Sequence, residues 1–145
     1  MKDGIRELRT PAELRLGYPV LRELREGLSL RDFLSIYKKA RAADGYALVG
    51  LFRGGSCAAV MGYRVLHDYV HGAHLYVDDL VTSAAFRSQG LGAELLGYAD
   101  KRAKALKCRK LRLCTGTDNT AGRRFYEREG WALRSVVYKK TRVGA

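Results

Sequence analysis

The sequence contains few of the residues that mark secreted, membrane-spanning or disordered proteins. It has 3 cysteines and 2 prolines among 145 residues. An odd set of cysteines (Cys57, Cys108, Cys114) without Cys-x-x-Cys spacing argues against a disulfide framework or a zinc site. No apolar run approaches the roughly 18 residues of a membrane span, and the N-terminus lacks the apolar segment of a signal peptide. These absences predict a cytoplasmic protein with no membrane partner.

The composition is that of a chain that folds by itself. Apolar residues make up 47% and charged residues 29%, which predicts a single globular domain over residues 1–145. Lysine and arginine number 27 against 15 acidic residues, giving a formal net charge of +12. Such a surface attracts anions, so nucleic acid, acidic lipid and small polyanionic ligands all remain open as partners.

The periodicity of apolar residues predicts a layered order of strands and helices. Thr10, Pro11 and Glu13 form a capping box with proline at the first helical position, which predicts a helix start. Strands are expected at 5–8, 46–52, 57–65, 74–82, 110–115 and within 131–141, and helices from 11, at 29–44, 90–106 and 120–128. This order predicts an α+β (α/β layered) domain with a mixed central sheet flanked by helices.

The most informative segment is a strand that leads into a turn whose glycines, Gly90 and Gly92, open an amphipathic helix. The first N–H groups of a helix lack intrahelical acceptors, and glycine lets a phosphate approach the backbone closely. The turn has neither the lysine of an ATPase loop nor the Gly-x-Gly-x-x-Gly spacing of a dinucleotide fold. It therefore indicates an anion site of another kind, with an ordinary tight loop as the alternative.

Two motifs carry a family resemblance. The run Arg87-Ser-Gln-Gly-Leu-Gly92 resembles the Arg/Gln-x-x-Gly-x-Gly/Ala signature of the GCN5-related N-acetyltransferase (GNAT) family. Downstream, residues 119–131 resemble the family segment Asn-x-x-Ala-x-x-x-Tyr-Glu-x-x-Gly-Phe. The resemblance covers roughly residues 46–140 and implies the GNAT fold and an N-acetyltransferase that acts on a primary amine, either a small molecule or a lysine or N-terminal amine.

The resemblance implies acetyl-CoA as the acetyl donor and no metal. Backbone amides of the glycine turn would surround the pyrophosphate, and the end of the preceding strand would align the pantetheine arm. The implied cofactor-binding residues are Leu80, Val81, Thr82, Arg87, Ser88, Gln89, Gly90, Leu91, Gly92, Ala93, Asn119, Gly122 and Tyr126. Asn119 has an alternative role as a helix cap. Because CoA is a polyanion, it also gives the net positive charge a small-molecule explanation.

Catalytic residues follow from the same resemblance. Tyr126 matches the family tyrosine that protonates the departing CoA thiolate, with a buried structural aromatic as the alternative. The stretch 75–81 is similar to the corresponding strand of polyamine-type members, which implies that Asp78 is the base or amine-binding carboxylate. Adjacent strand residues face opposite sides of a sheet, so one of Asp78 and Asp79 is expected to face the cleft. Salt bridges with the abundant arginines are the alternative role of the pair.

Other features carry weaker signals. His67, His71 and His74 are expected to be solvated loop histidines, because no helix and no completing Asp, Glu or Cys set is predicted around them. A non-catalytic acetyl-CoA-binding module remains the main alternative function. A basic nucleic-acid-binding domain is disfavoured because no helix-turn-helix, RRM or KH signature appears. The apolar residues of 136–143 are expected to support a homodimer.

Overall fold

The computed structural model describes residues 2–144, in two compact units, Met1–Leu113 and Cys114–Ala145. The first unit contains a five-stranded sheet in the order β1-β2-β3-β4-β5. Four of its strands pair antiparallel, and β5 runs parallel to β4. The strands are β1 (Gly4–Leu8), β2 (Ala47–Arg53), β3 (Ser56–Asp68), β4 (Gly72–Thr82) and β5 (Lys110–Leu113). The sheet is mixed, which confirms the predicted α+β class.

Three helices of the first unit begin and end where the sequence places the signals. They are α1 (Pro11–Leu24), α2 (Leu30–Asp44) and α3 (Leu91–Ala105), and a short 3₁₀ turn, η1 (Ala84–Phe86), precedes α3. Thr10 Oγ1 accepts from the Glu13 amide at 3.2 Å, and the Glu13 carboxylate accepts from the Thr10 amide at 2.9 Å. This reciprocal pair is the predicted capping box.

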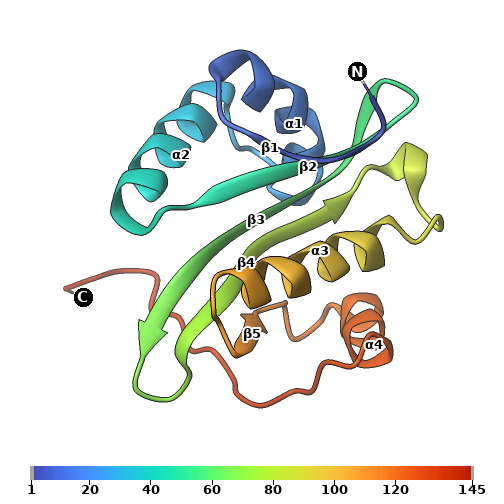
Figure 1. The fold of residues 1–145 in the computed structure, drawn as a ribbon. Helices are drawn as coiled ribbons and strands as arrows, with labels where there is room; N and C mark the ends of the chain where they lie inside the picture. The colour runs from blue at the N-terminus through green and yellow to red at the C-terminus, as the bar shows by residue number, and fades with distance from the viewer. Residues whose placement is uncertain (1, 145) are drawn as a thin grey trace. The chain divides into compact units, whose positions relative to one another are not determined.

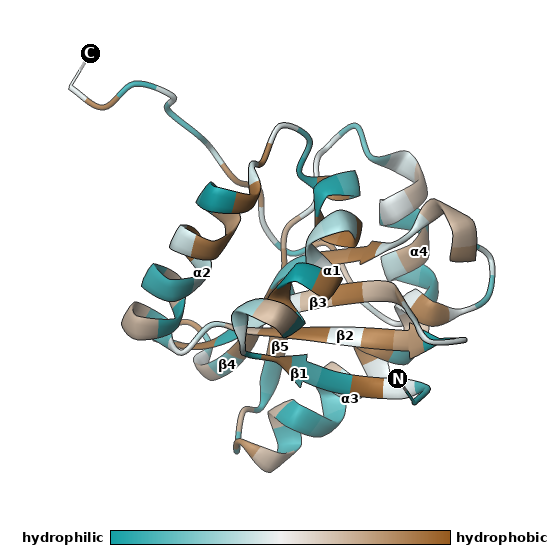
Figure 2. Ribbon diagram, turned by 90° about the horizontal axis from the view of Figure 1, so that it is seen from above, coloured by the Kyte–Doolittle hydropathy of each residue, from teal (hydrophilic) through white to brown (hydrophobic). Residues whose placement is uncertain are grey.

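The helices cover both faces of the sheet. Helices α1 and α2 pack on one face with Leu48, Phe52 and Val60, whereas α3 packs on the other with Val49 and Met61. Figure 1 shows this three-layer arrangement, and Figure 2 shows the central strands β2 and β3 as largely hydrophobic. Because both faces are buried, these strands read as continuous apolar runs in the sequence rather than as alternating ones.

The two ends of β4 have different neighbours. The parallel ladder with β5 joins His74–Val77 to Lys110–Leu113 and stops there, while β4 continues to Thr82. Among the described residues, the β5-side edge of β4 therefore has no strand partner beyond Val77. Such an open edge leaves backbone N–H and C=O groups that can bind an extended ligand.

The second unit contains α4 (Thr120–Arg128), as predicted. The strand expected within 131–141 is wrong, because the structure gives this segment no regular secondary structure. A strand requires a neighbouring backbone for its hydrogen bonds, and the described ladders all lie within residues 4–113. The apolar pattern alone does not supply that neighbour. None of the helices formed by residues 2–144 has the length and apolar character to cross a membrane.

Candidate active site

A pocket of about 350 Å³ opens in the first unit, where α1 and α2 approach β3 and β4. The helices and the connection between them supply an apolar wall. Strands β3 and β4 supply three of the four charged groups, and the Tyr46 hydroxyl comes from just before β2. The apolar wall consists of Leu21, Leu28, Phe33, Ile36, Tyr37 and Ala40. Two aspartates, Asp78 and Asp79, both line this cavity. A small apolar cavity with a few convergent polar groups is typical of a ligand site.

The two aspartates share one side because β4 carries a bulge. Gly62 of β3 pairs with Asp79 and Tyr63 pairs with Val77, so Asp78 is left without a cross-strand partner. One extra residue in a strand breaks the alternation of side chains at that point. The expectation that the pair faces opposite sides of the sheet is therefore wrong.

Asp79 is held by two partners. Arg25 donates to its Oδ1 at 3.0 Å, and the Tyr46 hydroxyl donates to its Oδ2 at 2.8 Å. Burial, reinforced by the charge of Asp79, raises the pKa of Tyr46 well above its ordinary value, so this phenol stays a proton donor. A Cβ on Gly62 would lie 1.9 Å from the Tyr46 hydroxyl oxygen, which explains why glycine stands there.

Asp78 is paired with Arg64, whose Nε donates to Asp78 Oδ2 at 2.9 Å. The same guanidinium donates to Asp44 at 2.8 Å, so Arg64 has a second acidic partner. Burial raises the pKa of Asp78 above its ordinary value even though Arg64 opposes the shift. Both aspartates thus make the ion pairs that the structural alternative predicts, and both remain on the pocket wall.

Three pocket residues, Arg25, Tyr46 and Arg64, were not predicted from the sequence. Arg64 carries a signal that points to it, because it is a charged residue in a mostly apolar stretch of strand, as Asp78 and Asp79 are. Arg25 is the C-cap residue of α1, and its side chain reaches β4. There it also donates to the Asp78 carbonyl oxygen at 2.9 Å. No local pattern in the sequence indicates that long-range contact.

The end of β4 presents the residues predicted to align the pantetheine arm. Leu80 packs into the α3 side of the core, and Val81 packs toward α1 and α2. Their side chains are therefore structural. Among the described residues the backbone of Leu80, Val81 and Thr82 has no strand partner on the β5 side, and its role toward the pantetheine arm stays a prediction. Glu23 of α1 fixes this end, since it accepts from the Ser83 hydroxyl and the Ala84 amide, both at 2.9 Å.

The glycine turn has the geometry of an open helix N-terminus. Gly90 is the N-cap of α3 with φ of 75°, and no side chain caps the first amides. No atom lies within 4 Å of a Cβ built on Gly90. Of the other predicted residues, Arg87, Ser88 and Gln89 are exposed, Leu91 is buried, and Gly92 and Ala93 are half-buried. Uncapped amides beside open space suit a phosphate, so acetyl-CoA fits this unit as a co-substrate.

In the second unit, Asn119 caps α4. Its Oδ1 accepts from the Gly122 amide at 3.1 Å, and its Nδ2 donates to Thr115 Oγ1 at 2.8 Å. A Cβ on Gly122 would lie 2.3 Å from Asn119 Nδ2, so the cap requires glycine there. The capping alternative is thus realised, and the role of both residues toward CoA stays a prediction.

Tyr126 lies on α4 and is half-buried. Its ring contacts Phe125 and Trp131, with centroid separations of 5.2 and 6.2 Å. Burial raises the pKa of Tyr126 above its ordinary value, and its hydroxyl makes no hydrogen bond with the described residues. The phenol is therefore protonated at neutral pH and available to a ligand.

Comparison with known proteins identifies the family. Residues 7–131 match the family described as "Acetyltransferase (GNAT) family". A Bacillus subtilis protein called uncharacterized N-acetyltransferase YhdJ is 28% identical over 137 residues, covering 94% of this chain and 96% of that one.

Solved structures agree on the fold. Aminoglycoside N-acetyltransferase AAC(6')-Iy, solved with the bisubstrate analog CoA-S-monomethyl-acetylneamine, superposes with a TM-score of 0.84 at 18% identity, covering 98% of this chain and 99% of that one. Glucosamine-6-phosphate N-acetyltransferase from Arabidopsis thaliana superposes with a TM-score of 0.75 at 21% identity, covering 97% of this chain and 98% of that one. The family match spans most of the chain and agrees with the fold and the glycine turn, so the chain belongs to the GNAT family of N-acetyltransferases.

Proposed function

We propose that the protein transfers an acetyl group from acetyl-CoA to a primary amine held in the Asp78–Asp79 pocket, by direct attack in a ternary complex. The observation that carries this proposal is the bulge in β4. It turns two consecutive carboxylates toward one apolar cavity in the part of β4 that has lost its β5 neighbour. An ammonium group is the ligand that such carboxylates bind best.

The pocket favours an amine with a single positive charge and an apolar body. Its two aspartates are offset by Arg25 and Arg64, so the four groups carry no formal net charge. The rest of the lining is aliphatic and aromatic. A polyamine would gain little from a balanced pocket and would be repelled by a surface of net charge +12.

In the proposed mechanism each residue handles one proton or one charge. Asp78 takes the proton of the bound ammonium, directly or through a water, and its raised pKa suits it to that exchange. A backbone N–H near Val81 or Thr82 stabilises the oxyanion. Tyr126 gives its proton to the departing thiolate. Asp79, held by Arg25 and Tyr46, orients the amine.

The donor is held by two parts of the chain. The backbone amides of residues 88–93 bind the pyrophosphate, and the open edge of β4 at Leu80, Val81 and Thr82 aligns the pantetheine arm. Asn119 and Gly122 contribute the cofactor contacts that the downstream motif implies. The uncapped start of α3 supports this assignment.

We also propose a cytoplasmic homodimer. Cys57, Cys108 and Cys114 are all free thiols, which suits a reducing compartment. Val136, Val137 and Tyr138 are 66%, 70% and 93% exposed. Contiguous exposed apolar residues of this kind support a protein contact through 136–143.

A label-transfer assay tests the proposed function. Purified protein with labelled acetyl-CoA and a panel of primary amines is expected to give labelled amide, fastest with amines of one charge and an apolar group. A melting-temperature rise with CoA but no labelled product from any amine would instead indicate a non-catalytic acetyl-CoA-binding module. Steep salt-dependent duplex binding without a CoA-induced shift would favour a nucleic-acid-binding domain.

A further inference from the structure

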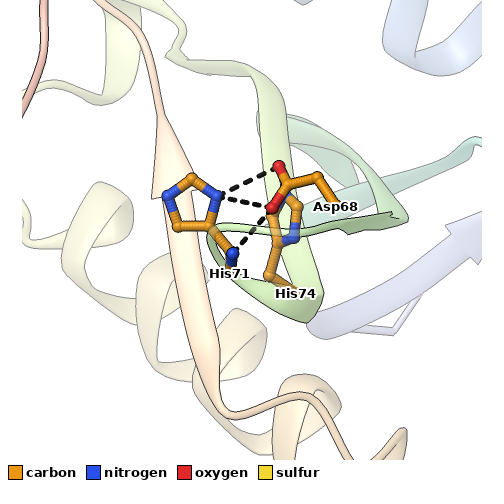
Figure 3. Close-up of side chains that lie close together, drawn as sticks. All are labelled: Asp68, His71 and His74. Atoms are coloured by element: carbon orange, nitrogen blue, oxygen red, sulfur yellow. Dashed lines mark hydrogen bonds and ion pairs between the residues drawn. The ribbon is translucent and has the colours of Figure 1, made fainter.

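A cluster of two histidines and an aspartate lies where β3 turns into β4, at the end of β4 opposite Asp78 and Asp79. Figure 3 shows Asp68, His71 and His74 with their side chains converging. One ligand atom from each residue lies within 4.8 Å of the others. The sequence predicts solvated loop histidines here. That expectation is wrong for His74, which lies in β4 and is 0% exposed.

His74 presents a buried nitrogen that has no hydrogen-bond partner. Its Nδ1 lies 3.0 Å from the Gly72 carbonyl oxygen, and a carbonyl only accepts, so Nδ1 carries the proton. In the neutral imidazole Nε2 then carries a lone pair, and this atom is buried without a hydrogen bond. A backbone carbonyl that fixes the tautomer in this way is the usual support of a metal-bound histidine.

That lone pair faces a carboxylate. His74 Nε2 lies 3.9 Å from Asp68 Oδ2, and His71 Nδ1 lies 3.0 Å from both carboxylate oxygens. Asp68 is an exposed carboxylate, and such a group is ionised at neutral pH. Two acceptors that face each other across a gap with no proton between them are satisfied by a cation.

We propose that Asp68, His71 and His74 form a site for a divalent transition-metal ion of the zinc type, with a water as fourth ligand. Zinc–nitrogen and zinc–oxygen bonds of roughly 2.0–2.2 Å place tetrahedral ligands about 3.3–3.5 Å apart. The separations of 3.0 and 3.9 Å lie on either side of that range, and every pair of ligand atoms lies within 4.8 Å, so side-chain rotation must bring the three ligands to the ion. Binding through His71 Nδ1 moves the proton of that atom to Nε2.

The proposed metal site would stabilise the β3–β4 hairpin and would take no part in acetyl transfer. The ion would join the turn residues Asp68 and His71 to the buried β4 residue His74. Asp68 already shapes this turn, because its Oδ1 accepts from the His71 amide at 2.7 Å. An asparagine in its place keeps that acceptor and removes the negative charge. The substitution therefore distinguishes the contribution of Asp68 to the turn from its contribution to metal binding.

Titration with Zn²⁺ and Co²⁺ of the full chain without a histidine tag tests the site. We expect one ion per chain, a visible Co²⁺ absorption band that Zn²⁺ abolishes, and a metal-dependent rise in melting temperature. Asp68→Asn and His71→Asn are each expected to weaken binding by about tenfold or more, since even outer-shell losses cost about that much. His67→Asn, on the exposed part of β3, is the matched control and is expected to bind as wild type does.

The result that overturns the proposal is equally direct. Absence of one-to-one binding in the wild type, or equal binding by wild type, Asp68→Asn and His71→Asn, removes the site. His74→Asn is the third variant. Because His74 is buried, this substitution can prevent folding. The test stays valid in that case, because Asp68 and His71 lie at the hairpin turn and are not buried.

Discussion

Asp78→Asn is expected to lower kcat/KM by about 100-fold at pH 7, because a positioned general base contributes about 10²–10⁴-fold. The amide keeps the size of the side chain but does not accept the proton of the ammonium. The remaining rate should rise about tenfold per pH unit, as the neutral fraction of the free amine grows. Steady-state assays of the labelled amide over a pH series measure both effects.

The wild-type pH profile follows from the same carboxyl. The base acts only when ionised, so activity falls as the pH drops through the pKa of Asp78, which burial places above the ordinary 3.8. Asp44→Asn is the matched control, since Asp44 shares Arg64 with Asp78 but does not line the pocket. Equal losses of kcat/KM in Asp78→Asn and Asp44→Asn would contradict the role of Asp78 as base. They would show that activity depends only on the charges that neutralise Arg64.

Stability should change in the opposite direction to activity. A carboxyl whose pKa is raised on folding stabilises the fold fully below its unfolded value and loses that contribution as the pH rises through the folded value. Ionised Asp78 therefore costs stability at neutral pH. Asp78→Asn is expected to melt no lower than wild type, so a lowered melting temperature would mean that the lost activity reflects misfolding.

Tyr126→Phe is expected to reduce kcat by about 100-fold with little change in the KM for acetyl-CoA. Phenylalanine keeps the ring contacts with Phe125 and Trp131, and the lost hydroxyl has no hydrogen-bond partner among the described residues. The melting temperature should therefore stay close to that of wild type. Kinetic assays with calorimetry separate loss of a proton donor from loss of packing.

Tyr138→Phe provides the control for this variant, because Tyr138 lies in the same unit and is 93% exposed. It should retain wild-type kcat. Full activity in Tyr126→Phe would remove that tyrosine from the role of acid and leave it as a structural aromatic, the alternative that the sequence permits.

Local signals predicted most of the fold. The capping box at Thr10 depends on a few neighbouring residues, and it appears in the structure. The family motifs likewise consist of short runs. The open N-terminus of α3 was predictable because a helix start and its free amides are properties of one segment.

Non-local geometry accounts for what the sequence did not reveal. The bulge at Asp78 depends on how β3 registers against β4, so alternation within β4 alone predicts the wrong faces. The cluster at the hairpin turn forms only when Asp68 and His74 are brought together across it. The expected strand within 131–141 fails because an apolar pattern does not provide a pairing partner.

Initial rates measured while acetyl-CoA and the best amine are varied together test the central claim most directly. Direct attack in a ternary complex predicts intersecting double-reciprocal lines, labelled amide as the only labelled product, and no label on the protein when the amine is omitted. Parallel lines, with label left on the protein after the donor is removed, would contradict direct attack by an amine held in the Asp78–Asp79 pocket.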